Sequence, residues 1–257
     1  MITEPDIYPQ KEPVIDEPVI RLMNVYKSFG NNHVLKDISL DLNKGENLVV
    51  LGKSGSGKSV LIKCIIGLIK PDKGIVKVLG KNIPDMNQNE LDTIRTKVGF
   101  LFQSNALYDS MTVRENLEFP LRRHGIKFSK EEVNAKVIEA LTNVGLSHTV
   151  DLSPSELSGG MKKRIALART LILEPEIILY DEPTAGLDPI TGTEISNLMR
   201  ELAIKYKTSS IIISHDMNCV KITSDRIALL LDGQCNIQGN YEGLKNSGDV
   251  KIKPFFE

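Results

Sequence analysis

The sequence lacks an excess of charge of either sign. Of its 257 residues, 32 are Lys or Arg and 33 are Asp or Glu, which gives a formal net charge of −1. A protein that binds nucleic acid is expected to carry a basic excess or a basic run, because it neutralises phosphates. The balanced charge therefore argues against a nucleic-acid partner.

Long apolar runs and paired cysteines are also missing. A transmembrane helix needs about 20 nearly uncharged residues, whereas the best apolar runs cover only residues 64–69 and 227–231. The N-terminus has neither the basic start nor the apolar stretch of a secretory signal. Cys64, Cys219 and Cys235 form no CxxC pair, which favours reduced, buried thiols in a cytosolic protein over a metal site.

Residues 1–19 differ in composition from the rest of the chain. They contain four prolines, and five acidic side chains against one lysine. Proline blocks helix and ladder hydrogen bonds, so this segment is expected to be an extended or disordered acidic tail. It is interpreted as a solvated leader, with an acidic docking arm as the alternative.

Strands and helices alternate after this tail. Turn residues at 31–32 and 43–45 favour hairpins. Continuous apolar runs at 48–51, 177–180 and 211–213 are typical of fully buried strands. Strands that alternate with helices predict a parallel sheet covered on both faces.

Residues 104–165 are predicted to be mostly helical. Ser129 and Glu132 have the spacing of a capping box, apolar residues recur at helical spacing after them, and Gly145 marks the expected stop. A second helix follows. Its predicted apolar face consists of Met161, Ile165, Ala168 and Ile172.

A phosphate-binding loop lies between the first buried strand and a helical stretch at 59–69. Residues 52–59 read GKSGSGKS and fit the pattern G-x-x-x-x-G-K-[ST]. In such a loop, backbone N–H groups and the helix N-terminus bind phosphate oxygens. Lys58 can reach the β and γ phosphates, and the Ser59 hydroxyl can bind Mg²⁺. The predicted nucleotide-binding residues of the loop are Gly52, Ser54, Gly55, Gly57, Lys58 and Ser59.

Two carboxylates end the second buried strand. Asp181 and Glu182 follow the apolar run, and the carboxyl end of a strand in an open parallel sheet faces the ligand crevice. Asp181 is predicted to hold Mg²⁺ through water, and Glu182 to polarise an attacking water. Acids after an apolar run often only cap a turn, but the neighbouring phosphate loop favours the functional interpretation.

A second anion-binding motif opens the helix after Leu157. Ser158 and the N–H groups of Gly159 and Gly160 lie at a predicted helix N-terminus. One nucleotide does not need two such motifs from the same chain. We therefore expect two chains to enclose two ATP molecules, with each second motif closing on the partner's ATP. The alternative is a helix N-cap with small residues for packing.

Together these motifs resemble the ATPase subunits of ABC transporters. The resemblance covers about residues 20–239. In chain order it includes the phosphate loop, a glutamine loop at Phe102-Gln103, the signature at 157–161, the acidic strand end, a D-loop at 185–188 and a histidine loop at 213–216.

The resemblance implies an α/β fold. It consists of a P-loop (RecA-like) ATPase core with a small antiparallel β subdomain and an inserted α-helical subdomain at about 104–165. The ABC ATPase domain would cover residues 20–240, and residues 241–257 would form a C-terminal extension.

The family pattern also assigns residue roles. Phe29 would stack on adenine. Gln103 would sense Mg²⁺ and the attacking water and link the site to a membrane partner. His215 would grip the γ-phosphate and position Glu182.

Three further residues would act across the dimer. Ser158 and Gly160 would contact the γ-phosphate of the partner's ATP, and Asp188 would bridge the two active sites. The sequence departs from the common pattern at Met161, where glutamine is usual, and at Phe29, where tyrosine is usual. Neither change removes a charge or a backbone donor, so activity is expected to survive.

Several segments are similar to the lipid-transport branch of the family, the Mla-type ATPases, which work with MCE-domain proteins. These segments are residues 154–164, 166–169, 101–108, 111–113 and 188–191 and the C-terminal Phe255-Phe256. The resemblance implies an ATP-hydrolysing homodimer that uses Mg²⁺ and drives a membrane permease, together with an MCE-domain protein. Its expected location is peripheral, on the cytoplasmic face of the inner membrane.

Residues 103–120 are the expected docking groove for a permease helix. Leu107, Tyr108, Met111 and Val113 could line that groove or could pack inside the helical subdomain.

Other functions remain open at this point. The main rival is an ABC transporter for another cargo, such as an amino acid or a lipoprotein. A soluble ABC ATPase of DNA repair or translation would usually carry paired cassettes or long coiled-coil insertions. A regulatory module without turnover would need neither Glu182 nor His215. The sequence leaves open whether a small soluble regulator binds.

Overall fold

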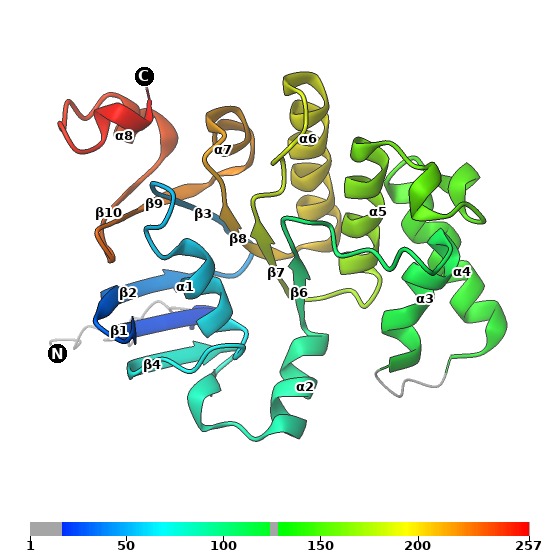
Figure 1. Ribbon diagram of the computed structural model, residues 1–257, viewed down its shortest axis with the longest axis horizontal. Coiled ribbons are helices and arrows are strands. Elements are labelled where there is room, and N and C mark those ends of the chain that lie inside the picture. The colour runs from blue at the N-terminus through cyan, green and yellow to red at the C-terminus, as the bar shows by residue number, and fades with distance from the viewer. Residues whose placement is uncertain (1–16, 124–127, 257) are drawn as a thin grey trace, which may run out of the picture.

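The computed structural model describes residues 17–123 and 128–256, so most of the predicted acidic tail lies outside the described residues. Figure 1 shows two sheets and, at one end, a group of helices. The first sheet is antiparallel and has the order β2-β1-β4-β5. Its strands are β1 (Ile20–Phe29), β2 (Asn32–Leu42), β4 (Lys73–Val78) and β5 (Lys81–Asn82).

The second sheet has six strands in the order β10-β9-β3-β8-β7-β6. All neighbours in it are parallel except β10, which runs antiparallel to β9. The predicted parallel sheet is confirmed, with the three apolar runs at its centre. Its strands are β3 (Asn47–Leu51), β6 (Val98–Leu101), β7 (Ile177–Asp181), β8 (Ser209–Ile213), β9 (Arg226–Leu231) and β10 (Gln234–Gly239).

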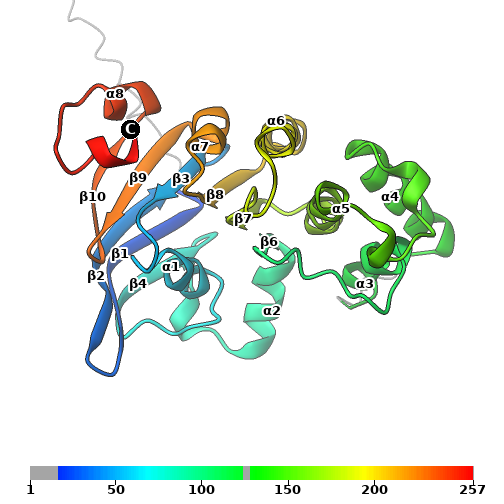
Figure 2. The same cartoon turned by 45° about the horizontal axis from the view of Figure 1, so that its top comes forward.

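Both faces of the six-stranded sheet are buried. Leu48 and Val50 of β3 belong to a core shared with the antiparallel sheet and α1, whereas Val49 and Leu51 belong to a core shared with α3, α4, α5 and α6. Figure 2 shows α1 on one side of the sheet and α6 on the other. Because successive side chains of a strand point to opposite faces, burial of both faces explains the unbroken apolar run.

One predicted hairpin is confirmed and the other is wrong. β1 and β2 form a hairpin with Gly30 and Asn31 in its turn. The turn after β2 instead carries the chain from the first sheet into the second, and within it the Glu46 N–H donates to the Asn43 carbonyl (3.2 Å). The reason is burial: a strand with no polar face lies in the sheet interior, between β8 and β9, and not at the edge beside β2.

The helical region lies at the far end of the six-stranded sheet, coloured green in Figure 1. The predicted capping box is present, since the Glu132 N–H donates to Ser129 Oγ and the Ser129 N–H donates to the Glu132 carboxylate. Gly145 follows this helix with a φ of 72°. The helices of this region are α3 (Val113–Arg123), α4 (Lys130–Asn143) and α5 (Gly159–Leu171).

The helix after the phosphate loop is shorter than predicted. α1 covers Lys58–Ile65 because Gly67, with a φ of 71°, turns the chain back so that the Leu68 N–H donates to the Lys63 carbonyl (2.8 Å). The remaining α-helices are α2 (Gln88–Thr96), α6 (Pro189–Tyr206), α7 (Met217–Thr223) and α8 (Tyr241–Lys245). Short 3₁₀ turns cover Ile83–Asp85, Ser147–Thr149, Pro154–Glu156 and Lys253–Phe255.

All three cysteines are buried free thiols, as expected. Burial raises the pKa of Cys64 and of Cys235 to about 11, so both stay protonated at neutral pH. Within residues 17–123 and 128–256, no helix has both the length and the apolar character needed to cross a membrane.

Candidate functional site

The phosphate loop turns tightly between β3 and α1. Lys58 folds back over it, and its Nζ donates to the carbonyls of Gly52 (2.7 Å) and Lys53 (3.0 Å). A Cβ at Gly52 would lie 2.5 Å from the Leu230 carbonyl oxygen, and Gly57 has a φ of 105°. Both positions therefore require glycine. Burial lowers the pKa of Lys58, while the nearby carboxylates act in the opposite direction.

Ser59 connects this loop to the end of β7. Its hydroxyl donates to Asp181 Oδ1 (3.3 Å). Burial raises the pKa of Asp181 more than the hydrogen bond from Ser59 lowers it. A hydroxyl and one carboxylate beside a phosphate loop are the oxygen donors with which proteins hold Mg²⁺ against a nucleotide, so these residues fit that ion. Among the described residues, no cluster of three or more His, Cys, Asp or Glu offers a metal cage of another kind.

Glu182 and His215 form the next pair, just beyond the carboxyl ends of β7 and β8. The ring Nδ1 of His215 lies 2.8 Å from Glu182 Oε2, and the His215 N–H donates to the same oxygen (3.3 Å). Glu182 has a φ of 51°, a left-handed conformation that costs a non-glycine residue about 1–2 kcal/mol. Its own N–H donates to the Ile213 carbonyl of β8 (2.9 Å), so pairing between β7 and β8 maintains this backbone.

A cavity of about 830 Å³ lies over these residues. That volume is in the range of small-molecule sites. Phe29 is half exposed at its margin, where a flat base could stack on the ring. The predicted residues that line the cavity are Phe29, Gly52, Ser54, Gly55, Gly57, Lys58, Ser59, Gln103, Glu182 and His215.

The cavity also has lining residues that the sequence did not suggest. Pro254 and Phe255 reach it from the C-terminal end of the chain, and Met217 reaches it from α7. The terminal aromatics appear in the sequence only as a resemblance to one branch, and nothing in their local pattern places them beside the phosphate loop.

Four predicted site residues do not line this cavity: Asp181, which accepts from the Ser59 hydroxyl, and Ser158, Gly160 and Asp188. Ser158 is the N-cap of α5, and its Oγ accepts from the Met161 N–H (3.2 Å). A Cβ at Gly160 would lie 2.8 Å from Thr191 Cγ2, so this glycine permits α5 and α6 to pack. Asp188 caps α6 by accepting from the Thr191 N–H (3.0 Å). The N-cap and packing roles considered as the alternative are therefore present in the single chain.

Asp188 lies beside a smaller cavity of about 260 Å³ that it shares with His215 and Asp216. Hydrogen bonds from Thr191, above all the one from its side chain, lower the pKa of Asp188 more than burial raises it. His215 therefore lies between the nucleotide-sized cavity and the D-loop.

The segment expected to receive a permease helix is divided between core and surface. Val113 is fully buried, and Leu107 and Met111 are partly buried. Tyr108 remains 42% exposed and packs on Phe119, with ring centroids 4.8 Å apart and ring planes tilted by 52°. Internal packing is therefore confirmed for Val113, whereas Tyr108 stays available at the surface.

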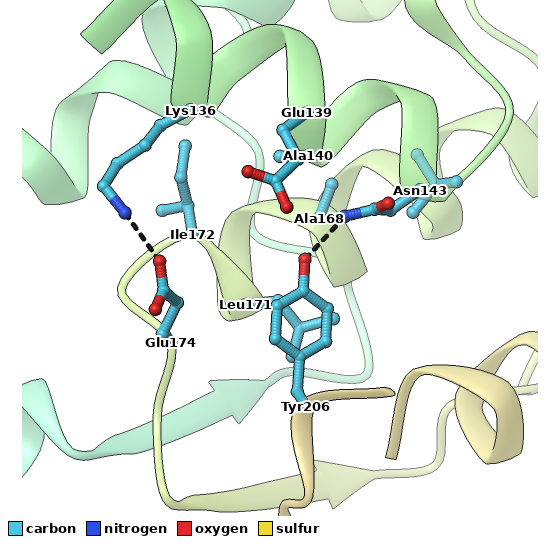
Figure 3. Close-up of a pocket in the computed structure, with 10 residues that line it drawn as sticks. Lys136, Glu139, Ala140, Asn143, Ala168, Leu171, Ile172, Glu174 and Tyr206 are labelled. Carbon is cyan, nitrogen blue, oxygen red and sulfur yellow. Dashed lines mark hydrogen bonds and ion pairs between the residues drawn. The ribbon is translucent and has the colours of Figure 1, made fainter. Parts of the chain in front are cut away.

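A separate pocket lies between α4, α5 and the end of α6 (Figure 3). Lys136 pairs with Glu174 (2.6 Å) across it, and Asn143 Nδ2 donates to the hydroxyl of Tyr206 (2.5 Å). Its volume is about 20 Å³, which is room for about one water molecule. We regard it as a packing feature of the helical region and not as a ligand site.

The chain matches known proteins over most of its length. The family described as ABC transporter matches residues 35–185. Protein TRIGALACTOSYLDIACYLGLYCEROL 3, chloroplastic, of Arabidopsis thaliana is 40% identical over 92% of this chain and 73% of its own. The methionine import ATP-binding protein MetN of Clostridium acetobutylicum is 40% identical over 88% of this chain and 70% of its own.

A solved structure agrees with this relationship. The dimeric post-hydrolysis state of the ATP-binding cassette MJ0796, bound to ADP and Pi, matches with a TM-score of 0.78 and 34% identity, over 86% of this chain and 98% of that one. The predicted P-loop α/β fold is confirmed. The chain belongs to the ABC transporter family, as an ATP-binding subunit that hydrolyses ATP with Mg²⁺.

Proposed function

We propose that this subunit works as a homodimer with two nucleotides between the chains. The cavity over the phosphate loop holds residues suited to one side of a nucleotide, whereas Ser158 and Gly160 lie elsewhere on the chain. Each nucleotide would lie between Lys58 of one chain and Ser158 of the partner subunit. Asp188 would bridge the two sites from its position beside His215.

We assign the catalytic roles as follows, and the positions of the side chains support them. Lys58 holds the β and γ phosphates. Ser59, Asp181 and Gln103 would hold Mg²⁺, which neutralises charge on the transferring phosphoryl group when bound. Glu182 polarises the attacking water, and His215 keeps the Glu182 carboxylate in place and contacts the γ-phosphate. The juxtaposition of Lys58, Asp181 and Glu182 at one edge of the sheet carries this proposal.

ABC ATPase subunits of this kind pair with membrane permeases. We place the permease contact at the exposed part of the segment after Gln103, around Tyr108. The subunit then lies at the cytoplasmic face of the inner membrane, where it has access to ATP.

For the cargo, we propose phospholipid, carried by an Mla-type system that includes an MCE-domain protein. The signature with Met161 and the segments at 101–108 and 188–191 support this branch. The name of the Arabidopsis relative is that of a glycolipid, which favours a lipid cargo over an amino acid. A small soluble regulator remains a further candidate partner.

Amino-acid import is the second candidate, because the methionine import relative is equally identical to the chain. Both candidates use the same ATPase site, since cargo need not touch this subunit. They differ in the permease and in the other proteins of the complex.

The test is affinity purification of the tagged full-length chain from detergent-solubilised native membranes, followed by mass spectrometry of proteins and lipids. A permease with an MCE-domain protein and bound phospholipid is the expected result. A permease with an amino-acid-binding protein would replace the phospholipid proposal by the import alternative. Recovery with nucleic-acid proteins and without a permease would contradict a transport function.

A further inference from the structure

Two cationic side chains of α5 lie beneath the loop that carries Gln103. Lys163 is only 2% exposed, and its Nζ donates to the Gln103 carbonyl (3.1 Å). Arg169, two turns further along, donates to the carbonyls of Asn105 (3.1 Å) and Ala106 (2.8 Å). Figure 1 shows the segment between β6 and α3 passing α5. Three carbonyls of this loop are thus attached to one helix.

Neither cation has a carboxylate partner among the described residues, since both contact only carbonyl and amide oxygens and the Tyr108 ring. Burial lowers the pKa of Lys163, with no neighbouring charge to oppose it. A buried lysine without a counter-ion destabilises a fold. We therefore expect Lys163 to have a role other than stabilising the fold.

The loop has a conformation that it would not adopt alone. Asn105 and Ala106 are consecutive non-glycine residues with φ of 64° and 51°. Left-handed backbone at such residues is unfavourable and persists where surrounding contacts hold it. Arg169 binds both carbonyls, and the buried Asn116 of α3 donates to the Tyr108 carbonyl (3.1 Å) and accepts from Arg169 (3.2 Å).

The same helix begins at the signature. Ser158 is the N-cap of α5, and Lys163 lies little more than one turn after it. A rigid helix therefore connects the residues proposed to contact the partner's nucleotide with the loop whose Gln103 lines the chain's own cavity. A shift of α5 that follows contact with the partner's ATP would move the Gln103 backbone through Lys163 and the following loop through Arg169.

We propose that Lys163 and Arg169 are positioning residues that couple the two ATP sites of the dimer, by transmitting the position of the signature to Gln103. This inference rests on the proposed dimer with nucleotides between the chains. It goes beyond that proposal because it assigns communication between the sites to two side chains that touch no nucleotide. It predicts that the coupling disappears when the Lys163 ammonium is removed, while each site can still bind ATP.

The test measures ATPase rate against ATP concentration for the purified full-length chain and for variants. Lys163→Met keeps the length of the side chain and removes the donor. We expect the Hill coefficient to fall toward 1 and the rate to fall about fivefold, within the usual size of allosteric coupling. Lys163→Arg should restore both quantities. Lys162→Met removes the neighbouring lysine of the same helix and should leave both as in the wild type.

A double-mutant cycle separates coupling from simple packing. In a Gln103→Ala background, Lys163→Met should change the rate less than about twofold, because its effect passes through Gln103. An equal effect in both backgrounds, or a Hill coefficient unchanged by Lys163→Met, would overturn the inference while leaving the dimer proposal intact. A wild-type chain that shows neither ATP-dependent dimerisation nor cooperativity would overturn the dimer proposal and, with it, this coupling. Arg169→Lys, tested in the same cycle, gives a second variant should Lys163→Met fail to fold.

Discussion

Glu182 Oε2 lies 2.8 Å from His215 Nδ1, and the His215 backbone N–H donates to the same oxygen (3.3 Å). The carboxylate is mostly buried, with 13% of its side chain exposed, whereas the imidazole is 72% exposed. One oxygen of Glu182 is therefore fixed by the histidine loop, and the other is free to face a water. The exposed part of the ring can still reach a phosphate.

Glu182→Gln is expected to abolish most turnover and to accumulate an ATP-bound dimer. The amide preserves the shape of the side chain but cannot act as a base, a change that costs about 100-fold or more in rate. Phosphate release and light scattering after gel filtration with ATP and Mg²⁺ provide the measurements. Glu176→Gln is the control, because Glu176 is exposed and pairs with Lys97 just before the same strand. Wild-type turnover by Glu182→Gln would contradict the catalytic role.

Phe29→Ala should raise the KM for ATP about tenfold and leave kcat nearly unchanged, since a stacked base contributes to binding and not to the chemical step. The Lys27 ammonium lies 5.4 Å from the ring centroid and is itself held by Asp72 (2.8 Å), so the ring is oriented before ATP binds. Phe29→Tyr keeps the ring and should behave as the wild type. Equal KM values for Phe29→Ala and the wild type would show that Phe29 does not stack on adenine.

Thr184→Val should lower turnover about tenfold through one lost hydrogen bond. Thr184 Oγ1 donates to Asp216 Oδ2 (2.9 Å), which joins the segment after Glu182 to the segment after His215. Valine has the same shape but leaves a partly buried carboxylate oxygen without this donor. Thr184→Ser keeps the donor and should retain turnover. The measurement is the steady-state ATPase rate, with circular dichroism as a folding control. Equal rates for Thr184→Val and Thr184→Ser would show that the Thr184 hydrogen bond does not support turnover.

Lys163→Met should make the chain more stable even as it uncouples the sites. Removing a buried cation without a counter-ion should stabilise the fold by about 1 kcal/mol, or about 2–4 °C in Tm for a chain of this size. The variant is therefore expected to gain thermal stability and to lose coupling between the sites. A variant that is both less stable and less active would point to ordinary structural damage.

Burial of Lys163 also predicts that the stability of the fold depends on pH. Burial lowers the pKa of Lys163 below its ordinary value of 10.5, so the unfolded state binds this proton more tightly than the folded state. Between the lowered pKa and 10.5 the unfolded chain carries more protons, and stability contributed by this group rises with pH. The stability difference between Lys163→Met and the wild type should therefore shrink as pH rises toward 10.5. Urea unfolding at several pH values measures it, and a difference that grows with pH would contradict the assignment.

The predictions that succeeded from sequence depended on local chemistry. The capping box at Ser129 and Glu132 needs only neighbouring residues to form, and the apolar run of β3 marks a buried strand by its own composition. The hairpin predicted at Asn43 was wrong because the residues of this turn suit a hairpin as well as a connection between two sheets. Only the burial of β3 on both faces directs the chain into the other sheet. The burial of Lys163 could not be predicted, since nothing in the local sequence reveals a buried ammonium.

The sequence by itself determined which groups are available for the proposed chemistry: a glycine-rich loop suited to phosphates, a hydroxyl and a carboxylate suited to Mg²⁺, and a glutamate at the end of an apolar strand. Each of these is recognised from the residue types of its own short segment. The tertiary structure decided which of them meet. It placed Ser59 against Asp181 and Glu182 against His215, kept Ser158 away from its own cavity, and attached the Gln103 loop to α5. Such relationships depend on the order of strands in the sheet, which is set by the burial of whole surfaces and not by local sequence.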